Sequence, residues 1–309
     1  MGIYAAALTI GALLPIFIQK LFIAYKRFDD VNHRSSHNTL ATRTGGIGVF
    51  LTLFGIALYQ YALGDEIFDF SLLIPLSIMF VVGVYDDLYN ADFKLKFLLQ
   101  IIVAKLMIDL GFVISNYHGL FGLYEVPWLL AQLSTVFVFL VVVNAINFID
   151  GIDGLAITEV IKTIIVIELF SRTPTPLVAL GGLTIACLLP LYYFNFRKKR
   201  KVFLGDAGSL FLGSLIMVYL LYVLGPNYQF KEGSQLNKVL FAVLVALYPL
   251  VDLLRVFILR IKDGQSPFKA DKRHLHHLLL DKVKSHKNII LIITISYVLF
   301  YIVFFKLNQ

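Results

Sequence analysis

Acidic and amide side chains gather beside glycines in one short stretch, "NAINFIDGIDGLA" at residues 144–156. It contains Asn144, Asn147, Asp150 and Asp153, and Gly151 follows the first acid. Carboxylate and amide oxygens are ligands for hard cations such as Mg²⁺, and glycine lets a ligand approach the backbone closely. Helix capping by the aspartates is the structural alternative. Four oxygen-bearing side chains exceed what a cap needs, so the stretch favours a Mg²⁺–phosphate site at the start of a helix.

Two further acidic motifs are typical of the same chemistry. Asp86 and Asp87 end an apolar run. Neighbouring residues of a helix point about 100° apart, so one carboxylate can face a metal or nucleophile while the other orients it. A polar helix end is the alternative, although acids at a helix C-terminus oppose its dipole. Asp206 lies in "FLGDAGSLFLG" at 203–213, where the glycines suit close helix packing but do not account for the acid. We interpret Asp206 as a cation ligand.

Three histidines, His274, His276 and His277, form the motif "HLHH" next to Arg273. A zinc site is one interpretation, but the chain has no HExxH motif and no cysteine nearby. A cationic, hydrogen-bonding clamp for phosphate fits the neighbouring basic residues better. A solvated loop is the structural alternative.

The elements that must position these residues are membrane helices. The chain has 309 residues, of which 59% are hydrophobic and 15% charged, against about 45–50% and about 25% in soluble domains. Its apolar runs have the length that spans about 30 Å of hydrocarbon. We therefore predict an all-α, polytopic integral membrane protein with a single domain, 1–309, and about ten transmembrane helices. They are expected near 3–24, 45–63, 69–85, 95–115, 128–146, 155–171, 176–195, 204–224, 238–260 and 288–306.

The distribution of lysine and arginine predicts the orientation. Basic residues concentrate in alternate connections, around 26–43, 94–96, 197–201 and 260–287, and such loops are cytoplasmic. Both termini are then outside, and the polar motifs share a cytoplasmic face. The net charge of +7 reflects these loops and anionic lipid rather than nucleic acid. We interpret "RKKRK" at 197–201 as a topology anchor. Lys105 and Asp109 are expected to pair inside the helix bundle.

Magnesium-type ligands, phosphate-binding helix starts and basic side chains at one membrane surface suit phosphoryl transfer from a soluble diphosphate to a membrane lipid. Such a reaction depends mainly on positioning and on charge neutralisation. The longest polar connection, about 261–287, is the only one large enough to hold a helix of its own.

Five motifs occur in one order along the chain: "RSSHNTLATRTGG", "DDLYNADFKLKFLLQ", "NAINFIDGIDGL", "FLGDAGSLFLG" and "SPFKADKRHLHH". They resemble the polyprenyl-phosphate N-acetylhexosamine-1-phosphate transferases of glycosyltransferase family 4, which has WecA-like, TagO-like and MraY-like branches. The resemblance covers nearly the whole chain, and the WecA-like branch fits best. It implies transfer of N-acetylhexosamine-1-phosphate, by default GlcNAc-1-phosphate, from a UDP-N-acetylhexosamine to undecaprenyl phosphate in a bacterial inner membrane. UMP leaves, and the lipid-linked product starts a cell-envelope polysaccharide such as O-antigen or capsule.

The resemblance also implies roles for individual residues. Mg²⁺, or Mn²⁺ in its place, is held by Asp206 with Asn147, and the Asp86–Asp87 pair positions or deprotonates the acceptor. Substrate contacts are implied for the nucleotide-facing segment, which contains Asn144, Asp150, Gly151 and Asp153, and for Phe203, whose ring can lie against uracil. The histidine motif, His274, His276 and His277, is implied near the diphosphate. Phosphate contacts are also implied for Lys96, Arg43 and His37.

The chain departs from the family pattern at Asn90, where an acid or a lysine is common, and "HLHH" replaces the MraY-like "HHHxE". The second departure favours a small UDP-sugar over a muramyl-pentapeptide donor, which remains an alternative. A transporter of an anionic substrate is the non-enzyme alternative, although the acids lie at helix ends rather than at the membrane midplane and no inverted repeat is visible. The oligomeric state is open, with a homodimer as one option.

Overall fold

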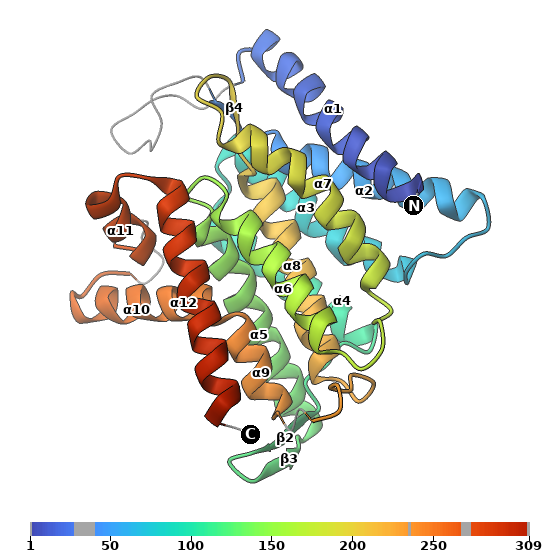
Figure 1. Ribbon diagram of the computed structural model, residues 1–309, viewed down its shortest axis with the longest axis vertical. Coiled ribbons are helices and arrows are strands. Elements are labelled where there is room, and N and C mark those ends of the chain that lie inside the picture. Colours follow the sequence, from blue (N-terminus) through green and yellow to red (C-terminus); the bar gives the residue numbers. More distant parts are fainter. Residues whose placement is uncertain (1, 28–40, 234–235, 267–272, 308–309) are drawn as a thin grey trace.

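The computed structural model describes residues 2–27, 41–233, 236–266 and 273–307, with side chains up to Tyr301. Most of them are helical (Figure 1). The helices are α1 (Gly2–Ala24), α2 (Gly45–Ala62), the short η1 (Phe70–Leu72), α3 (Leu73–Tyr89), α4 (Phe93–Asp109), α5 (Trp128–Ile149), α6 (Leu155–Phe170), α7 (Val178–Asn195), α8 (Gly205–Leu224), α9 (Lys238–Val245), α10 (Leu247–Lys262), α11 (Leu275–Val283) and α12 (His286–Leu307).

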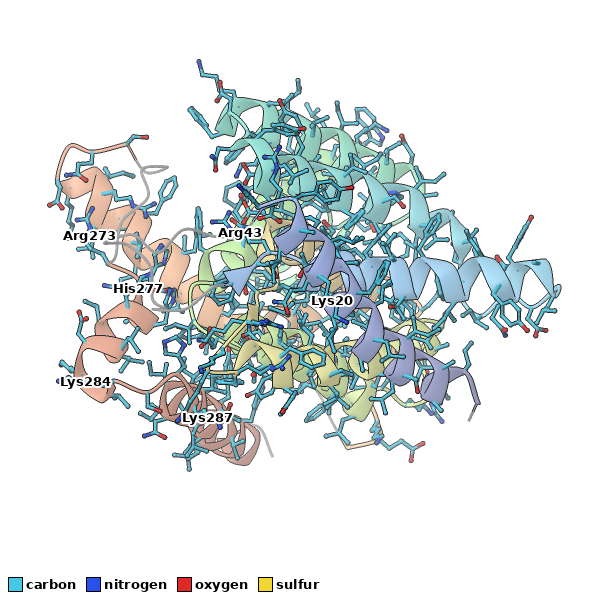
Figure 2. All side chains as sticks on the ribbon, turned by 90° about the horizontal axis from the view of Figure 1, so that it is seen from above. Lys20, Arg43, Arg273, His277, Lys284 and Lys287 are labelled. Atoms are coloured by element: carbon cyan, nitrogen blue, oxygen red, sulfur yellow. The ribbon has the colours of Figure 1, made fainter. Side chains whose placement is uncertain are left out.

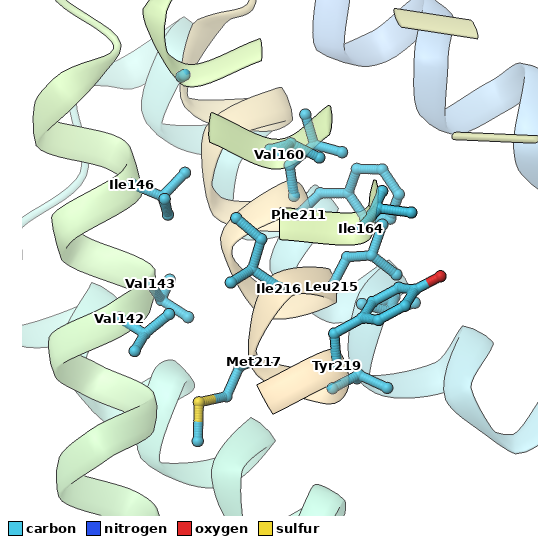
Figure 3. Packing of buried hydrophobic residues seen from close by; sticks show 14 of the residues in the cluster. Val142, Val143, Ile146, Val160, Ile164, Phe211, Leu215, Ile216, Met217 and Tyr219 are labelled. Atoms are coloured by element: carbon cyan, nitrogen blue, oxygen red, sulfur yellow. The ribbon is translucent and has the colours of Figure 1, made fainter. Parts of the chain in front are cut away.

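Helix α8 lies at the centre of the bundle and is buried almost throughout. It packs against α2, α3, α5 and α6, and Figure 3 shows Val143 and Ile146 of α5 facing Ile216 of α8. The contact with α3 is a backbone contact, because a Cβ added at Gly83 would lie 2.2 Å from the carbonyl oxygen of Asp206. This packing brings the end of α3 against the start of α8.

The outer helices present apolar side chains outward, as a protein in a lipid environment does. Six helices are long and apolar enough to span a membrane, and the bent pair α9–α10 makes up to seven. The chain is therefore a mostly helical membrane protein. Each of the ten ranges expected from sequence overlaps a helix, but α4 ends at Asp109, before the expected end at 115, and α4 and α6 have only 17 and 16 residues.

The ninth expected span is not a continuous helix, which corrects the sequence-based prediction. Helices α9 and α10 meet at Ala246 with a bend of 76°. Pro249 lies in the first turn of α10, where it has no N–H for the carbonyl four residues earlier and its ring disfavours a straight helix. The N–H of Tyr248 instead donates to the hydroxyl of Tyr297 on α12.

Short strands lie at the two ends of the bundle. β1 (Ala41–Thr42) pairs in parallel with β4 (Lys201–Val202) at the end that carries α11, and the β2–β3 hairpin (Asn116–Leu120 and Leu123–Glu125) lies at the other end (Figure 1). α11 occupies the long polar connection, about 261–287, whose length in the sequence is large enough to hold a helix of its own. Lys105 and Asp109 do pair, but both side chains are more than half exposed. Their expected position inside the bundle is therefore wrong; at the end of α4, the paired charges can reach the membrane surface.

Candidate active site

The two acids of the Asp86–Asp87 pair have different partners. Asp86 accepts the N–H of Ala91 at 2.8 Å and the ammonium of Lys96 at 2.6 Å. Asp87 accepts the N–H groups of Asp206 and Ala207, at 3.0 and 2.9 Å, one on each oxygen. Asp87 therefore caps the N-terminus of α8, where a negative charge is favourable.

Asn90 is the position at which the chain departs from the pattern of the family that its motifs resemble. Asn90 ends α3 in the left-handed conformation, with φ of 53°, and donates its N–H to the carbonyl oxygen of Asp86. Asparagine adopts this conformation more readily than most residues other than glycine.

Asp206 lies close to both acids of the pair: its N–H donates to Asp87, and its carboxylate is near the Lys96 that binds Asp86. Its Oδ1 accepts from the amide of Asn147 at 3.0 Å, and its Oδ2 is 3.7 Å from the Lys96 ammonium. The carboxyl groups of Asp86 and Asp206 are within hydrogen-bonding range of each other. Two carboxylates this close need a shared proton or a cation between them.

The balance of charges in the whole cluster also indicates that it needs a proton or a cation. Within the described part of the chain, four acids gather around two cations: Asp86, Asp87, Asp150 and Asp206 with Arg43 and Lys96. Burial raises the pKa of Asp150 well above its ordinary value, although part of its surface is exposed, and the carboxylates of Asp206, Asp87 and Asp153 raise it further. A divalent cation would balance the excess, and carboxylate and amide oxygens are the ligands that Mg²⁺ takes. The residues present therefore fit Mg²⁺.

The two predicted asparagines of α5 face different partners. Asn147 donates to Asp206 and, at 2.8 Å, to the hydroxyl of Ser209, which places it beside the acids. Asn144 exchanges hydrogen bonds with Gln100 of α4 and also donates to the carbonyl oxygen of Leu140. These bonds tie α4 to α5, so the structure brings Asn147, but not the amide of Asn144, into contact with Asp206.

Asp153 is held from two sides. Lys201 of β4 donates to its carboxylate, and His286 at the start of α12 has Nδ1 3.0 Å from it. Burial opposes the charged form, but these partners outweigh it and hold the pKa of Asp153 below its ordinary value. Asp153 does not cap α6, whose first turn follows Gly154 in the left-handed conformation with φ of 77°. Its observed contacts brace the turn.

The histidines lie directly over this turn. A Cβ added at Gly151 would be 3.2 Å from Nε2 of His276 and 3.4 Å from Cε1 of His277, and Figure 2 shows His277 at this end of the molecule. His276 is completely buried; its Nε2 has no hydrogen-bond partner among the described residues, and its Nδ1 faces the Asp252 carboxylate at 3.5 Å. Burial lowers its pKa below the ordinary value, which favours neutral imidazole.

Asp252 of α10 supports the histidines and was not predicted from sequence. Its Oδ2 is 3.0 Å from Nδ1 of His274 and 3.5 Å from Nδ1 of His276, and its Oδ1 accepts the N–H of Leu275 at 2.7 Å. Asp252, His274 and His276 are all buried, and their ligand atoms lie within 4.8 Å of one another, close enough to hold a metal ion. An acid inside the apolar run "YPLVDLLRVF" is the signal that could have identified Asp252.

The remaining predicted residues flank the start of α8. The N–H groups of Phe203 and Gly45 bond across the β1–β4 pair, which places Phe203 and Arg43 on adjacent strand ends. Arg43 lies 3.4 Å from Asp87. His37 lies outside the described residues. Lys201 and His286 were also missed as partners of the site, because Lys201 belongs to a basic run and His286 is a lone histidine in a polar connection.

The fold and the site define a class: a multi-pass helical membrane protein with a crowded acidic cluster at one end of its bundle. The chain belongs to glycosyl transferase family 4, whose model matches residues 70–224. It is 29% identical over 93% of its length to the probable undecaprenyl-phosphate N-acetylglucosaminyl 1-phosphate transferase of Bacillus subtilis, of which it covers 78%.

Two further relatives agree. The decaprenyl-phosphate N-acetylglucosaminephosphotransferase of Mycobacterium tuberculosis is 30% identical over 95% of this chain and 78% of its own length. The undecaprenyl-phosphate alpha-N-acetylglucosaminyl 1-phosphate transferase of Salmonella typhi is 29% identical over 94% of this chain and 79% of its own length. The family predicted from the five motifs is confirmed, and the chain is a transferase.

Proposed function

We propose that this protein transfers N-acetylhexosamine-1-phosphate, by default GlcNAc-1-phosphate, from a UDP-sugar to undecaprenyl phosphate. An oxygen of the lipid phosphate attacks the β-phosphorus, the bond to the UMP oxygen breaks, and a lipid-linked sugar diphosphate remains. The printed activities of the relatives support this reaction. The structural observation that carries it is the meeting of Asp86, Asp206 and Lys96 at one point, where two phosphate groups have to be brought together.

Asp206 and Asn147 would hold Mg²⁺, with Asp86 within reach of the same position. When bound, the cation neutralises the charge of the donor diphosphate. Asp86 faces the acceptor, which it positions or deprotonates. Asp87 acts mainly by fixing the start of α8 and so the direction of Asp206.

The donor occupies the region between the acids and the histidines in this proposal. His276 offers an unpartnered Nε2 above Gly151 and can hydrogen-bond a phosphate oxygen there. Lys96 and Arg43 supply positive charge next to the acids, and Phe203 provides a ring for the base. Asp252 fixes the histidines in place. Carboxylate–imidazole pairs of this kind set the tautomer and orientation of the ring.

We further propose the membrane arrangement expected from sequence. The single domain 1–309 crosses a bacterial inner membrane ten times, its termini are outside, and the active site faces the cytoplasm. The gathering of Arg43, Arg273, Lys284 and Lys287 at the end seen in Figure 2 supports a cytoplasmic site. The homodimer remains an option for the assembly.

A donor panel tests this function. The purified protein is incubated with undecaprenyl phosphate, Mg²⁺ and UDP-GlcNAc, other UDP-N-acetylhexosamines or UDP-muramyl-pentapeptide, and the lipid product and UMP are measured. We expect product with a UDP-N-acetylhexosamine and Mg²⁺-dependent exchange of labelled UMP into the donor. Product only with the muramyl-pentapeptide would assign the alternative donor, and no UMP-dependent exchange with any donor would refute the proposed reaction.

A further inference from the structure

A groove of about 670 Å³ lies where α7 ends and α12 begins, within the range of about 300–1,000 Å³ typical of small-ligand sites. Its lining contains none of the residues placed in the active site. The aromatic rings of Tyr192, Tyr193 and Phe196 form its walls. Its cations come from two separate segments: Arg197, Lys198 and Lys199 after α7, and Lys287 at the start of α12.

Within the described part of the chain, none of the four cations forms an ion pair with an acid, whereas nearby Lys201 is bound to Asp153. The guanidinium of Arg197 is 5.4 Å from the ring of Phe194, and the ammonium of Lys287 is 5.5 Å from the ring of Phe196. Aromatic faces offset only part of the repulsion between cations, so an anion between the two segments would stabilise the arrangement.

The groove lies at the level where a candidate span leaves the membrane. α7 is such a span and ends at Asn195, and only Phe196 separates it from the basic run. Tyrosine and long basic side chains concentrate at the bilayer interface. On the membrane side, Leu189 and Tyr193 are 52% and 69% exposed and provide an apolar flank that continues from the groove along α7. The groove therefore suits a molecule with an anionic head and an apolar tail.

We propose that this groove binds the phosphate headgroup of an anionic phospholipid from the surrounding leaflet, with an acyl chain along Leu189 and Tyr193. A topology anchor accounts for the basic run alone. It does not account for a walled groove whose fourth cation, Lys287, comes from a distant segment. The polyprenyl acceptor is a different anionic lipid, and its phosphate has to reach Asp86 and Asp206, neither of which lines the groove. The inference does not depend on the proposed reaction.

Native mass spectrometry of the full chain in detergent tests the proposal. The protein is mixed with phosphatidylglycerol or phosphatidylcholine of matched chains, and the retained lipid is measured. We expect one tightly retained phosphatidylglycerol, bound at least tenfold better than phosphatidylcholine. The K198Q/K199Q/K287Q variant should bind it about 100-fold more weakly, since each basic residue contributes roughly a fivefold factor towards an anionic surface. The matched control K94Q/K262Q/K282Q removes three exposed charges outside the groove and should bind like the wild type.

Folding is checked by size-exclusion elution and by UMP exchange, which all three proteins should retain because no substituted lysine belongs to the proposed active site. If the triple variant does not fold, the single variants K198Q and K287Q should each lower retention roughly fivefold. Equal retention of both lipids by the wild type, or wild-type retention by the groove variant, overturns the proposal. Displacement of the retained lipid by equimolar undecaprenyl phosphate, or by inorganic phosphate alone, would also overturn it by assigning the groove to the acceptor or to a free anion.

Discussion

Substitution of Asp87 by asparagine separates the contributions of the acidic pair to stability and to activity. Both carboxylate oxygens of Asp87 accept N–H groups from the start of α8, and the side chain is 4% exposed. Asparagine keeps the size but has one acceptor oxygen, so one buried N–H loses its partner and the helix dipole loses its compensating charge. A hydrogen bond to a charged group contributes about 1.5–3 kcal/mol, and an acid at a helix N-terminus up to about 2 kcal/mol. Burying the charge of Asp87 has a cost that offsets part of this stabilisation, so we expect Asp87→Asn to lower the free energy of unfolding by about 2 kcal/mol, close to the cost of one unsatisfied buried N–H.

Asp86→Asn is the matched comparison, because it changes the neighbouring residue in the same chemical way. Asp86 caps no helix, and its carboxyl group lies against that of Asp206. Asparagine at this position removes both the ion pair with Lys96 and the repulsion towards Asp206, two effects of opposite sign. We therefore expect little change in stability, while turnover falls by about 10²–10⁴, the usual contribution of a group that handles a proton.

The assay measures thermal unfolding in detergent, followed by size-exclusion chromatography, next to UMP exchange at saturating Mg²⁺. Asp87→Asn should show a lowered Tm and an activity that recovers in part at low temperature. Asp86→Asn should show a native Tm and no such recovery. A native Tm for Asp87→Asn combined with a lowered Tm for Asp86→Asn would refute the assignment of the capping role to Asp87.

Four further changes test the remaining parts of the site. Asp206→Asn should abolish turnover without loss of membrane insertion, and substantial residual activity at any Mg²⁺ concentration would contradict its metal role. Gly151→Ala should displace the histidines by a few tenths of an ångström and raise the KM for the UDP-sugar about tenfold at native Tm; an unchanged KM would remove the histidines from the donor site. Asp252→Asn should lower kcat/KM about tenfold through the buried histidines, with no zinc found by elemental analysis of the wild type; stoichiometric zinc would assign a metal site instead. Because the pKa of His276 is lowered in the folded protein, the unfolded chain binds more protons than the folded one as the pH falls through about 6.5. The Tm of the wild type should therefore drop between pH 7 and about pH 5.5, and the Tm of His276→Gln should drop less. Equal drops in Tm would contradict a buried neutral ring.

Much of the fold could be predicted from sequence because membrane helices have a strong signal: length and apolar composition suffice. The bend at Ala246 could not be placed by that signal, since Pro249 is tolerated in many apolar runs and the deciding contact, from Tyr297, comes from a distant helix. Oxygen ligands beside glycines identified Asp206 and Asn147, which the structure does bring together.

The partners of the histidines could not be predicted in the same way. Asp252 is one acid in an apolar helix, and only the bend between α9 and α10 and the position of α11 bring it against His274. The same limit applies to Asp153, whose partners Lys201 and His286 lie 48 and 133 residues away. Sequence patterns show which residues can do chemistry, whereas long-range packing decides which of them only hold others in place.

The glycines show how packing sets the geometry of the acids. At Gly83, α3 approaches α8 so closely that a Cβ would overlap the backbone of Asp206, and at Gly46 a Cβ would lie 2.2 Å from the N–H nitrogen of Gly208. α8 is therefore held between α2 and α3 at its first turn, where Asp87 also binds its free N–H groups. A carboxylate that is to share a cation must be positioned to within a few tenths of an ångström, and backbone contacts are stiffer than contacts between long side chains. The adjacent acids thus complement each other: Asp87 fixes the helix that carries Asp206, and Asp86, held by Lys96 and the N–H of Ala91, faces Asp206.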